Sequence, residues 1–334
     1  MTPLSPKAGL GSAPFFVIGA PRSGTTMLRL MLNRHSRLRV PRESWFLLKI
    51  LDAVPHSGTL TSAQAEKIIE IIEAEARWAD WEPPEGSLRE AVYGQGLQDL
   101  SGTIDRIFRL CCGMGTKERW GDKTPWYSLK VLELAKVFPT AKFIHIHRDA
   151  RDVLISMKDR GWYGRSIWRL SAYWKWMTDE AMKGRALGPS RYIEVAYEDL
   201  VRQPRETLLR ICGLLEEPFE ESMLTFYESA STETANWENQ LHVKTRRPPS
   251  EADLERWRKE LSSREVFIME ALVGDSMDAI GQKRRFTGPW TVGLWVPRFF
   301  AALRRMALDI EGKVRGRLGL PQRADRPAGA ADAD

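Results

Sequence analysis

A short apolar run followed by a glycine-bounded loop constrains this chain more than any other feature. Residues 15–18 read FFVI, and such an unbroken run is typical of a strand buried on both faces of a parallel sheet. The next eight residues, 19–26, read GAPRSGTT, and the apolar side chains of 27–32 predict a helix. This order predicts a phosphate cradle, because loop N–H groups and the helix N-terminus converge on one anion. Hydroxyl donors are present at Ser23, Thr25 and Thr26.

The loop departs at one position from the G-x-x-x-x-G-K-[ST] pattern of nucleotide triphosphatases. Gly19, Gly24 and Thr26 fit the pattern. Thr25, however, occupies the lysine position, and Arg22 is the only cation of the loop. Without that lysine, a β/γ-phosphate and its Mg²⁺ lose their usual partner, whereas an arginine can hold a phosphate-like group without a metal. The sequence therefore favours anion binding over a tight turn that binds nothing.

The loop resembles the 5′-phosphosulfate loop of the sulfotransferase family, whose members use 3′-phosphoadenosine-5′-phosphosulfate (PAPS). Its arginine form, PRSGTT, is closer to the tyrosylprotein and bacterial branches than to the cytosolic branch. The resemblance implies an enzyme that moves a sulfuryl group from PAPS to a hydroxyl acceptor without a metal. It also implies that Arg22 acts in catalysis by holding the sulfonate and the leaving phosphate. The implied donor-binding residues of the loop are Arg22, Ser23, Gly24, Thr25 and Thr26.

PAPS has a second anionic end, which requires a second anion site. Arg148 follows a strong strand signal at 141–147, and Ser156 comes eight residues after it. Arginine binds phosphate through a charge-assisted fork. The spacing from Arg148 to Ser156 resembles the family's 3′-phosphate motif, and HRDARD resembles its usual RDPRD. The alternative is an arginine that pairs with Asp149 or Asp152 at the start of a helix.

Sulfuryl transfer needs a base for the acceptor proton and cations for the developing charge. Glu43, in RESWF, is the candidate general base, because the segment loosely resembles the one that carries the catalytic glutamate of tyrosylprotein sulfotransferases. The alternative is a surface glutamate paired with Arg42 or Arg39. Lys123, in DKTP, is similar in place to the family's second catalytic cation, and Asp122 is expected to orient it.

Further positions extend the resemblance or compete with it. Tyr197, in VAYEDL, matches the place where relatives stack the adenine, although a tyrosine that ends a strand is often part of the core. Arg247, ten residues before Trp257, matches the C-terminal loop that closes over the donor in relatives. His145 and His147 lie on the same side of the predicted strand, where structural histidines are favoured over a histidine base.

The order of strand and helix signals predicts the fold class. Apolar runs at 15–18, 141–147 and 191–195 alternate with helical segments, which favours an α/β fold with a P-loop-like, doubly wound parallel sheet flanked by helices. Two inserted helices, at about 62–78 and 97–110, form a candidate lid, with packing helices as the alternative. Their buried sides are expected at Ile68, Ile69, Ile71 and Ile72 in the first helix and at Ile104, Ile107 and Leu110 in the second.

The net charge of +6 gives no case for a nucleic-acid partner once it is located. Residues 281–334 hold eleven Lys/Arg and five Asp/Glu, which leaves 39 of each sign in the body. Cys111, Cys112 and Cys212 form neither a disulfide framework nor a usual metal-ligand spacing, so buried thiols are expected. The N-terminus has no signal-like stretch, and the uncharged run at 286–297 is too short to span a bilayer. A reducing, cytoplasmic setting is therefore expected.

The C-terminal segment has an amphipathic pattern. Apolar residues recur at steps of four, three, four and four on one helical face, at Phe299, Leu303, Met306, Ile310 and Val314. Tryptophans precede them at positions 290 and 295. The pattern predicts peripheral membrane contact through residues 290–318, with a helix packed on the enzyme body as the alternative.

The predicted organisation is a disordered leader at 1–13, a sulfotransferase domain at 14–282, a basic amphipathic segment at 283–320 and a disordered tail at 321–334. A P-loop kinase or other NTPase is the alternative function, and it would require a lysine at position 25 and an acidic Mg²⁺ ligand at a strand end. A binding module without turnover is a third reading. The acceptor stays open among small molecules, glycolipids and peptides. Aromatic residues at 162–176 either line an apolar acceptor pocket or belong to the core.

Overall fold

The computed structural model describes residues 13–161, 164–230 and 243–287, which all belong to one compact unit that ends at Gly288. Residues 1–12 of the predicted leader lie outside these ranges, as do the predicted membrane-contact segment at 290–318 and the tail after it. Among the residues described, none of the helices combines the length and apolar character needed to span a membrane.

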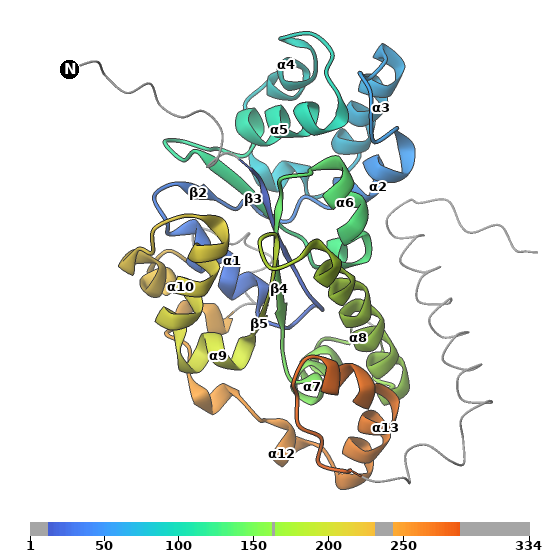
Figure 1. Ribbon diagram of the computed structural model, residues 1–334, viewed down its shortest axis with the longest axis vertical. Helices are drawn as coiled ribbons and strands as arrows, with labels where there is room; N and C mark the ends of the chain where they lie inside the picture. The colour runs from blue at the N-terminus through green and yellow to red at the C-terminus, as the bar shows by residue number, and fades with distance from the viewer. Residues whose placement is uncertain (1–12, 162–163, 231–242, 288–334) are drawn as a thin grey trace, which may run out of the picture. The chain divides into compact units, whose positions relative to one another are not determined.

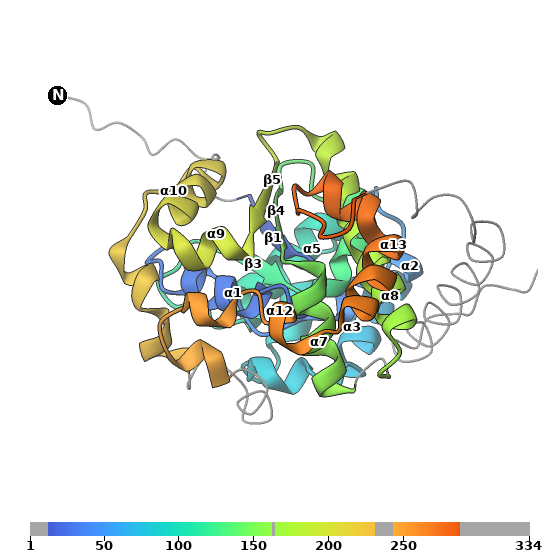
Figure 2. The same ribbon diagram turned by 90° about the horizontal axis from the view of Figure 1, so that it is seen from below.

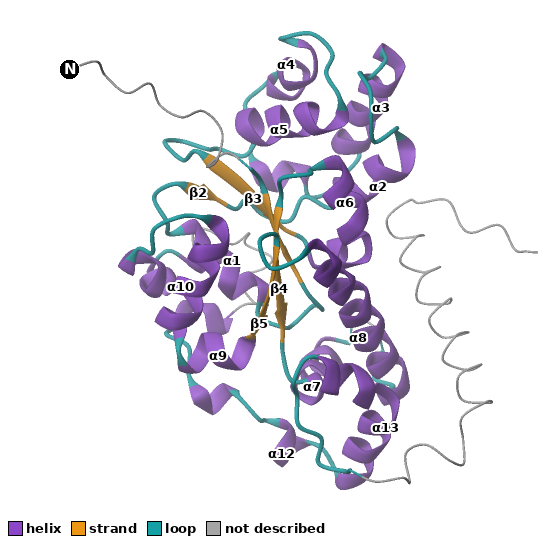
Figure 3. Cartoon of the chain, viewed as in Figure 1, coloured by secondary structure: helices purple, strands orange, loops and turns teal. Residues whose placement is uncertain are grey.

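Five parallel strands form the sheet in the order β2-β3-β1-β4-β5 (Figure 3). They are β1 (Phe15–Ile18), β2 (Leu38–Arg39), β3 (Arg119–Lys123), β4 (Lys142–His147) and β5 (Tyr192–Ala196). The central strand, β1, pairs Val17 with Lys123 of β3 and with Ile144 of β4. All four residues of β1 are fully buried, which confirms the strand predicted from the apolar run.

Helices cover both faces of the sheet. In the two views of Figures 1 and 2, α1, α9 and α10 lie on one side and α8 and α13 on the other. This arrangement confirms the α/β fold with a doubly wound parallel sheet. The described helices are α1 (Thr25–Asn33), α2 (Phe46–Ala53), α3 (Ser62–Glu73), α4 (Ser87–Tyr93), α5 (Leu100–Cys111), α6 (Val131–Val137), α7 (Ala150–Arg160), α8 (Ile167–Met182), α9 (Tyr197–Arg202), α10 (Pro204–Leu215), α12 (Trp257–Glu260) and α13 (Ser263–Ala279). Short 3-10 helices are η1 (Trp78–Trp81), η2 (Pro125–Lys130), η3 (Lys183–Leu187), η4 (Glu221–Glu228), η5 (Val243–Arg246) and η6 (Glu251–Asp253).

An all-helical insertion, α2 to α5, separates β2 from β3. The two helices predicted in this insertion are present as α3 and α5, and a capping box between Thr61 and Gln64 begins α3. The prediction missed α2 and α4. The residues just before these helices, Trp45 and Gly86, have left-handed backbone conformations and give no capping side-chain hydrogen bond. The prediction was also wrong about Leu110, which is 43% exposed; Ile71 is only partly buried.

Strand β3 escaped prediction because its sequence, RWGDK, is mostly polar. Its Arg119, Asp122 and Lys123 are nevertheless buried. Gly121 lets the strand pack closely against β1, since a Cβ there would lie 2.3 Å from the ring of Phe15. Lys123, the last residue of β3, thus lies beside the end of β1, where the loop at 19–26 begins.

Both histidines of β4 are buried in the sheet. His145 Nδ1 lies 2.8 Å from the hydroxyl of Tyr192 on β5. Burial lowers the pKa of both imidazoles, that of His147 to about 3. The two rings are therefore neutral near pH 7 in the folded protein, and their structural role stays a prediction.

We expect His147 to lower the stability of the fold as the pH is lowered. Below about pH 6.5, the ordinary pKa of a histidine, His147 binds a proton in the unfolded chain but not in the folded one. The free energy of unfolding therefore drops by about 1.4 kcal/mol for each pH unit between about pH 6 and pH 4. His147→Phe should remove this contribution. Urea unfolding at several pH values measures it, and equal pH dependence in the parent and the variant would contradict the account.

Candidate functional site

The loop after β1 needs glycine at two positions. Gly19 has φ 147, and a Cβ there would lie 2.1 Å from the carbonyl oxygen of Ile146 on β4. Gly24 has φ 94, and its Cβ would lie 2.3 Å from Cδ2 of Tyr197 at the start of α9. Both residues combine a left-handed backbone with close packing, which other residues do not tolerate. The two glycines hold the loop against β4 and α9.

A cavity of about 720 Å³ opens beside this loop. Its lining brings together seven of the residues predicted to bind the donor, namely Arg22, Gly24, Thr25, Thr26, Arg148, Ser156 and Tyr197. Arg160 and Arg256 add two further cations, against the carboxylates of Asp159 and Asp253. The predicted Ser23 is not part of the lining; it is fully buried, and its Oγ has no hydrogen-bond partner within the part of the chain that the structure describes. A basic cavity at the N-terminus of α1 suits an anionic ligand.

Arg22 joins the loop to helix α7. Its backbone is left-handed, with φ 73, a conformation that costs of the order of 1–3 kcal/mol for a residue other than glycine. Its Nε donates a hydrogen bond to Ser156 Oγ over 2.9 Å. Burial, together with the nearby cations Arg160 and Arg148, lowers the pKa of Arg22 to about 10. Arg256 lines the same cavity, so four arginines lie around it, an arrangement that a bound anion would stabilise.

Arg148 makes the ion pair that was the alternative to phosphate binding, and it lines the cavity as well. Its Nη2 lies 3.2 Å from Asp152 Oδ2 and donates to the carbonyl oxygen of Asp253 over 2.9 Å. The guanidinium carbon sits 4.5 Å from the centre of the Tyr197 ring, while Nε is buried and has no hydrogen-bond partner among the described residues. Arg247 is not among the residues that line the cavity; it pairs with Asp253 Oδ2 at 2.5 Å, and the backbone of Asp253 accepts a hydrogen bond from Arg148.

Lys123 connects the loop to Glu43. The ammonium of Lys123 donates to Thr26 Oγ1 over 3.3 Å and to Glu43 Oε1. Glu43 Oε2 accepts hydrogen bonds from Trp45 Nε1 and from Arg77 Nη1, both over 2.7 Å. Burial alone would raise the pKa of Glu43, but Lys123 and Arg77 outweigh it and hold the pKa at about 2. The carboxylate is therefore ionised, with these two cations rather than Arg42 or Arg39 as its partners.

Asp122 does not orient Lys123 as expected; it holds the segment beside Glu43. It is fully buried and accepts hydrogen bonds from Ser44 Oγ over 2.5 Å and from Thr124 Oγ1 over 3.0 Å. Ser44 Oγ also bonds to the hydroxyl of Tyr127. Burial raises the pKa of Asp122 to about 7. This network fixes Ser44, and with it the neighbouring Glu43, on the end of β3.

Sequence reasoning missed three cations of the site, namely Arg160, Arg256 and Arg77. Arg160 stands four residues after Ser156 on the same helix, so helical spacing could have identified it. Arg77 belongs to the inserted helices, 34 residues from Glu43. No local spacing marks it. Within the described residues, no group of three or more His, Cys, Asp or Glu side chains is arranged to hold a metal ion.

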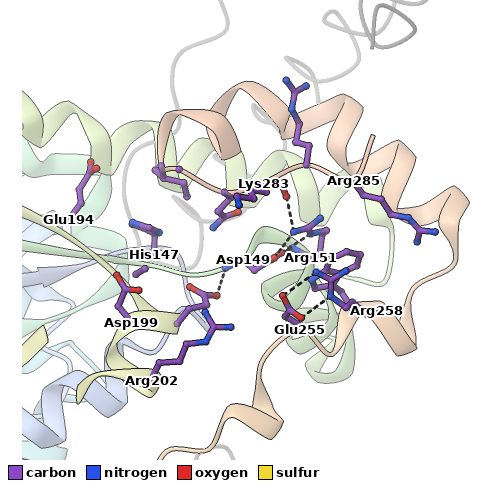
Figure 4. A pocket seen from close by; sticks show the side chains of 17 residues that line it. His147, Asp149, Arg151, Glu194, Asp199, Arg202, Glu255, Arg258, Lys283 and Arg285 are labelled. Atoms are coloured by element: carbon purple, nitrogen blue, oxygen red, sulfur yellow. Dashed lines mark hydrogen bonds and ion pairs between the residues drawn. The ribbon is translucent and has the colours of Figure 1, made fainter. Parts of the chain in front are cut away.

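A second cavity, of about 590 Å³, lies on the other side of the α7 N-terminus. Some of its charged side chains pair with one another, as Figure 4 shows for Asp149 with Arg151 and for Glu255 with Arg258. Of the predicted site residues and their alternatives, His147 and Asp149 line it. We therefore place the functional site in the first cavity, where the two anion motifs meet.

Comparison with known proteins identifies the family of the chain. The sequence matches the model of the Sulfotransferase family over residues 14–221. A putative protein-tyrosine sulfotransferase of Caenorhabditis briggsae is 26% identical over 228 residues, which cover 65% of this chain and 70% of that protein. Protein-tyrosine sulfotransferase A of Caenorhabditis elegans is 25% identical over 64% of this chain and 52% of its own length. An uncharacterized protein of Aquifex aeolicus is 26% identical, and the match covers only 27% of it.

Solved structures show the same fold. The sulfotransferase domain from the Synechococcus PCC 7002 olefin synthase aligns with a TM-score of 0.55 at 22% identity, over 84% of this chain and 97% of that one. The sulfotransferase domain from the curacin biosynthetic pathway aligns with a TM-score of 0.52 at 20% identity, over 83% and 99% of the two chains. The likeness supports the P-loop-like α/β architecture.

The contact between Gly24 and Tyr197 is testable by a double-mutant cycle. Gly24→Ala should destabilise the protein by about 1–3 kcal/mol, because its Cβ collides with the ring and the backbone is left-handed. In a Tyr197→Ala background the collision is absent, so the same change should cost at least about 1 kcal/mol less. Chemical denaturation of the four proteins measures the coupling. Additive effects would mean that the ring does not confine the loop.

Proposed function

Because the chain belongs to the sulfotransferase family, we propose that it transfers a sulfuryl group from PAPS to a hydroxyl acceptor. The observation that carries the proposal is that a single cavity joins the loop at 19–26 to Arg148 and Ser156, residues that lie more than a hundred positions later in the sequence. A donor with phosphate groups at both ends needs such a pair of anion sites. The unpartnered, buried Ser23 Oγ and Arg148 Nε are further polar atoms at these two sites.

Each part of the site has a role in this reaction. When bound, PAPS supplies the activated sulfuryl group. Residues of the loop and the start of α1 bind its 5′ end, and Arg148 and Ser156 bind its 3′-phosphate. Glu43 is the base that takes the proton of the acceptor hydroxyl. Lys123 touches both Thr26 and Glu43, so its charge lies between the loop and the base, where it stabilises charge that develops during transfer.

The kinase or NTPase alternative fits the site less well. The loop carries Thr25 where such an enzyme needs lysine, and β4 is followed by Arg148 where an acidic Mg²⁺ ligand would stand. Lys123 comes from β3 and is engaged by Glu43. We propose no metal in the reaction.

The class of acceptor is proposed from the relatives. The relatives named as protein-tyrosine sulfotransferases make a tyrosine-containing peptide the first acceptor to assay, beside small molecules and glycolipids. The matched segment is only part of those proteins, so their substrates are candidates and no more. The proposal also keeps four further predictions. Tyr197 stacks the adenine, and Arg247 belongs to a loop that closes over the donor. Residues 290–318 make peripheral membrane contact, and the protein works in a cytoplasmic setting.

Nucleotide binding distinguishes the two enzyme classes. We expect 3′,5′-ADP, the donor product, to raise the melting temperature of the protein without a metal, because a ligand that binds only the folded state stabilises it. ATP with Mg²⁺ should have a weaker effect. Thermal shift assays at matched concentrations measure both. Stabilisation by ATP–Mg²⁺ alone would refute the sulfotransferase proposal.

Glu43→Gln should separate binding from turnover. The change keeps the shape of the side chain and removes the proton acceptor. We expect the affinity for 3′,5′-ADP to stay within a few-fold of the parent, while the rate of sulfation of a hydroxyl acceptor falls to near the background rate. Calorimetry and a radiolabelled PAPS assay measure the two quantities. Turnover within a few-fold of the parent would place the base elsewhere.

A further inference from the structure

The inserted helices contribute a cation to the proposed base. Arg77, between α3 and η1, lies with Nη1 at 2.7 Å from Glu43 Oε2. Its guanidinium carbon sits 4.7 Å from the centre of the Trp45 ring, and Trp45 Nε1 donates to the same carboxylate oxygen over 2.7 Å. Arg77 and Trp45 thus both donate hydrogen bonds to the same oxygen of Glu43.

The other oxygen is held from the opposite side by Lys123. A carboxylate offers about four lone-pair positions, so these three donors fix its plane and leave one position for a hydroxyl. The side chain of Glu43 is 13% exposed and that of Lys123 is 2% exposed, so solvent screens these contacts little. The position of Glu43 therefore depends on both cations.

Other contacts fasten the segment that carries Arg77. Arg42 Nη1 donates to the carbonyl oxygen of Asp80 over 2.7 Å, and Trp81 Nε1 donates to the carbonyl oxygen of Arg42 over 2.8 Å. Lys49 pairs with Glu75 at 3.0 Å. Residues 75–81 are thus bound to the Glu43 segment independently of Arg77 itself, and removal of its guanidinium should leave them in place.

We propose that Arg77 is a positioning residue for sulfuryl transfer, which acts through Glu43 by holding one oxygen of its carboxylate so that the other oxygen faces Lys123. The inference rests on the proposed function and extends it to the inserted helices, which become part of the catalytic site. Nothing in the family resemblance assigns a role to Arg77.

Loss of Arg77 should change the pH dependence of Glu43. The charged groups that face it are Lys123 from β3 and Arg77 from the insertion, and the carboxyl of Asp122 lies nearby on β3. Without Arg77, burial is opposed mainly by Lys123 and Trp45, so the pKa of Glu43 must rise from about 2. Loss of an opposite charge at this distance corresponds to about 1 to 3 pH units.

The test compares Arg77→Met with the parent, with Arg77→Lys as the conservative variant. Arg89→Met is the matched control, because Arg89 lies on the same insertion but pairs with the exposed Glu66. NMR titration of protein labelled with carbon-13 at the glutamate carboxyl groups gives the pKa of Glu43, assigned through Glu43→Gln. We expect it to rise by about 1 to 3 pH units in Arg77→Met, by less in Arg77→Lys and not in Arg89→Met.

The acid limb of kcat/KM for PAPS-dependent sulfation should move in the same order, and thermal unfolding checks that each variant is folded. An unchanged pKa of Glu43 and an unchanged acid limb in Arg77→Met would overturn the inference and reduce Arg77 to a packing contact. That result leaves the proposed function intact if the parent binds 3′,5′-ADP and transfers the sulfuryl group. A parent that does neither overturns the function, and the inference with it.

Discussion

The buried ammonium of Lys123 is the interaction on which the site depends. A cation that is only 2% exposed must be paired and hydrogen-bonded to remain charged. Lys123 finds these partners in Thr26, at the start of α1, and in Glu43, before α2. The phosphate-type loop and the proposed base are therefore held at a fixed separation by one side chain of the central sheet. The segment that carries Glu43 is in turn anchored to β3 through Ser44 and Asp122.

The second anion motif shows that a structural and a binding role can coincide. The ion pair of Arg148 with Asp152 would by itself suggest a helix-start contact. The same pair, together with the Tyr197 ring under the guanidinium, holds Arg148 at the cavity beside Ser156 and Arg22. A preorganised arginine loses less side-chain entropy when an anion binds. The pairing is therefore compatible with the phosphate binding that we propose for Arg148.

The parts of the fold and site that could be predicted are those that short stretches of sequence determine. The apolar run alone predicts strand β1, and the glycines alone predict the tight loop after it. The spacing from Arg148 to Ser156 involves only α7 and the two residues before it. Strand β3 could not be predicted, because its buried charges are compensated by partners far away in the sequence. Arg77 could not be predicted for the same reason, since an ion pair between an insertion and a loop leaves no periodic signal. The role given to Asp122 was wrong because its true partner, Ser44, comes from the segment of the base.

A crystal structure of the protein with 3′,5′-ADP tests the central claim most directly, namely that one cavity binds both ends of the donor. The account predicts the 5′-phosphate on the N–H groups of the loop at 19–26 and the 3′-phosphate within hydrogen-bond distance of Arg148 and Ser156. A nucleotide bound in the cavity beside His147 and Arg151, or one with its 3′-phosphate in the loop, would contradict it.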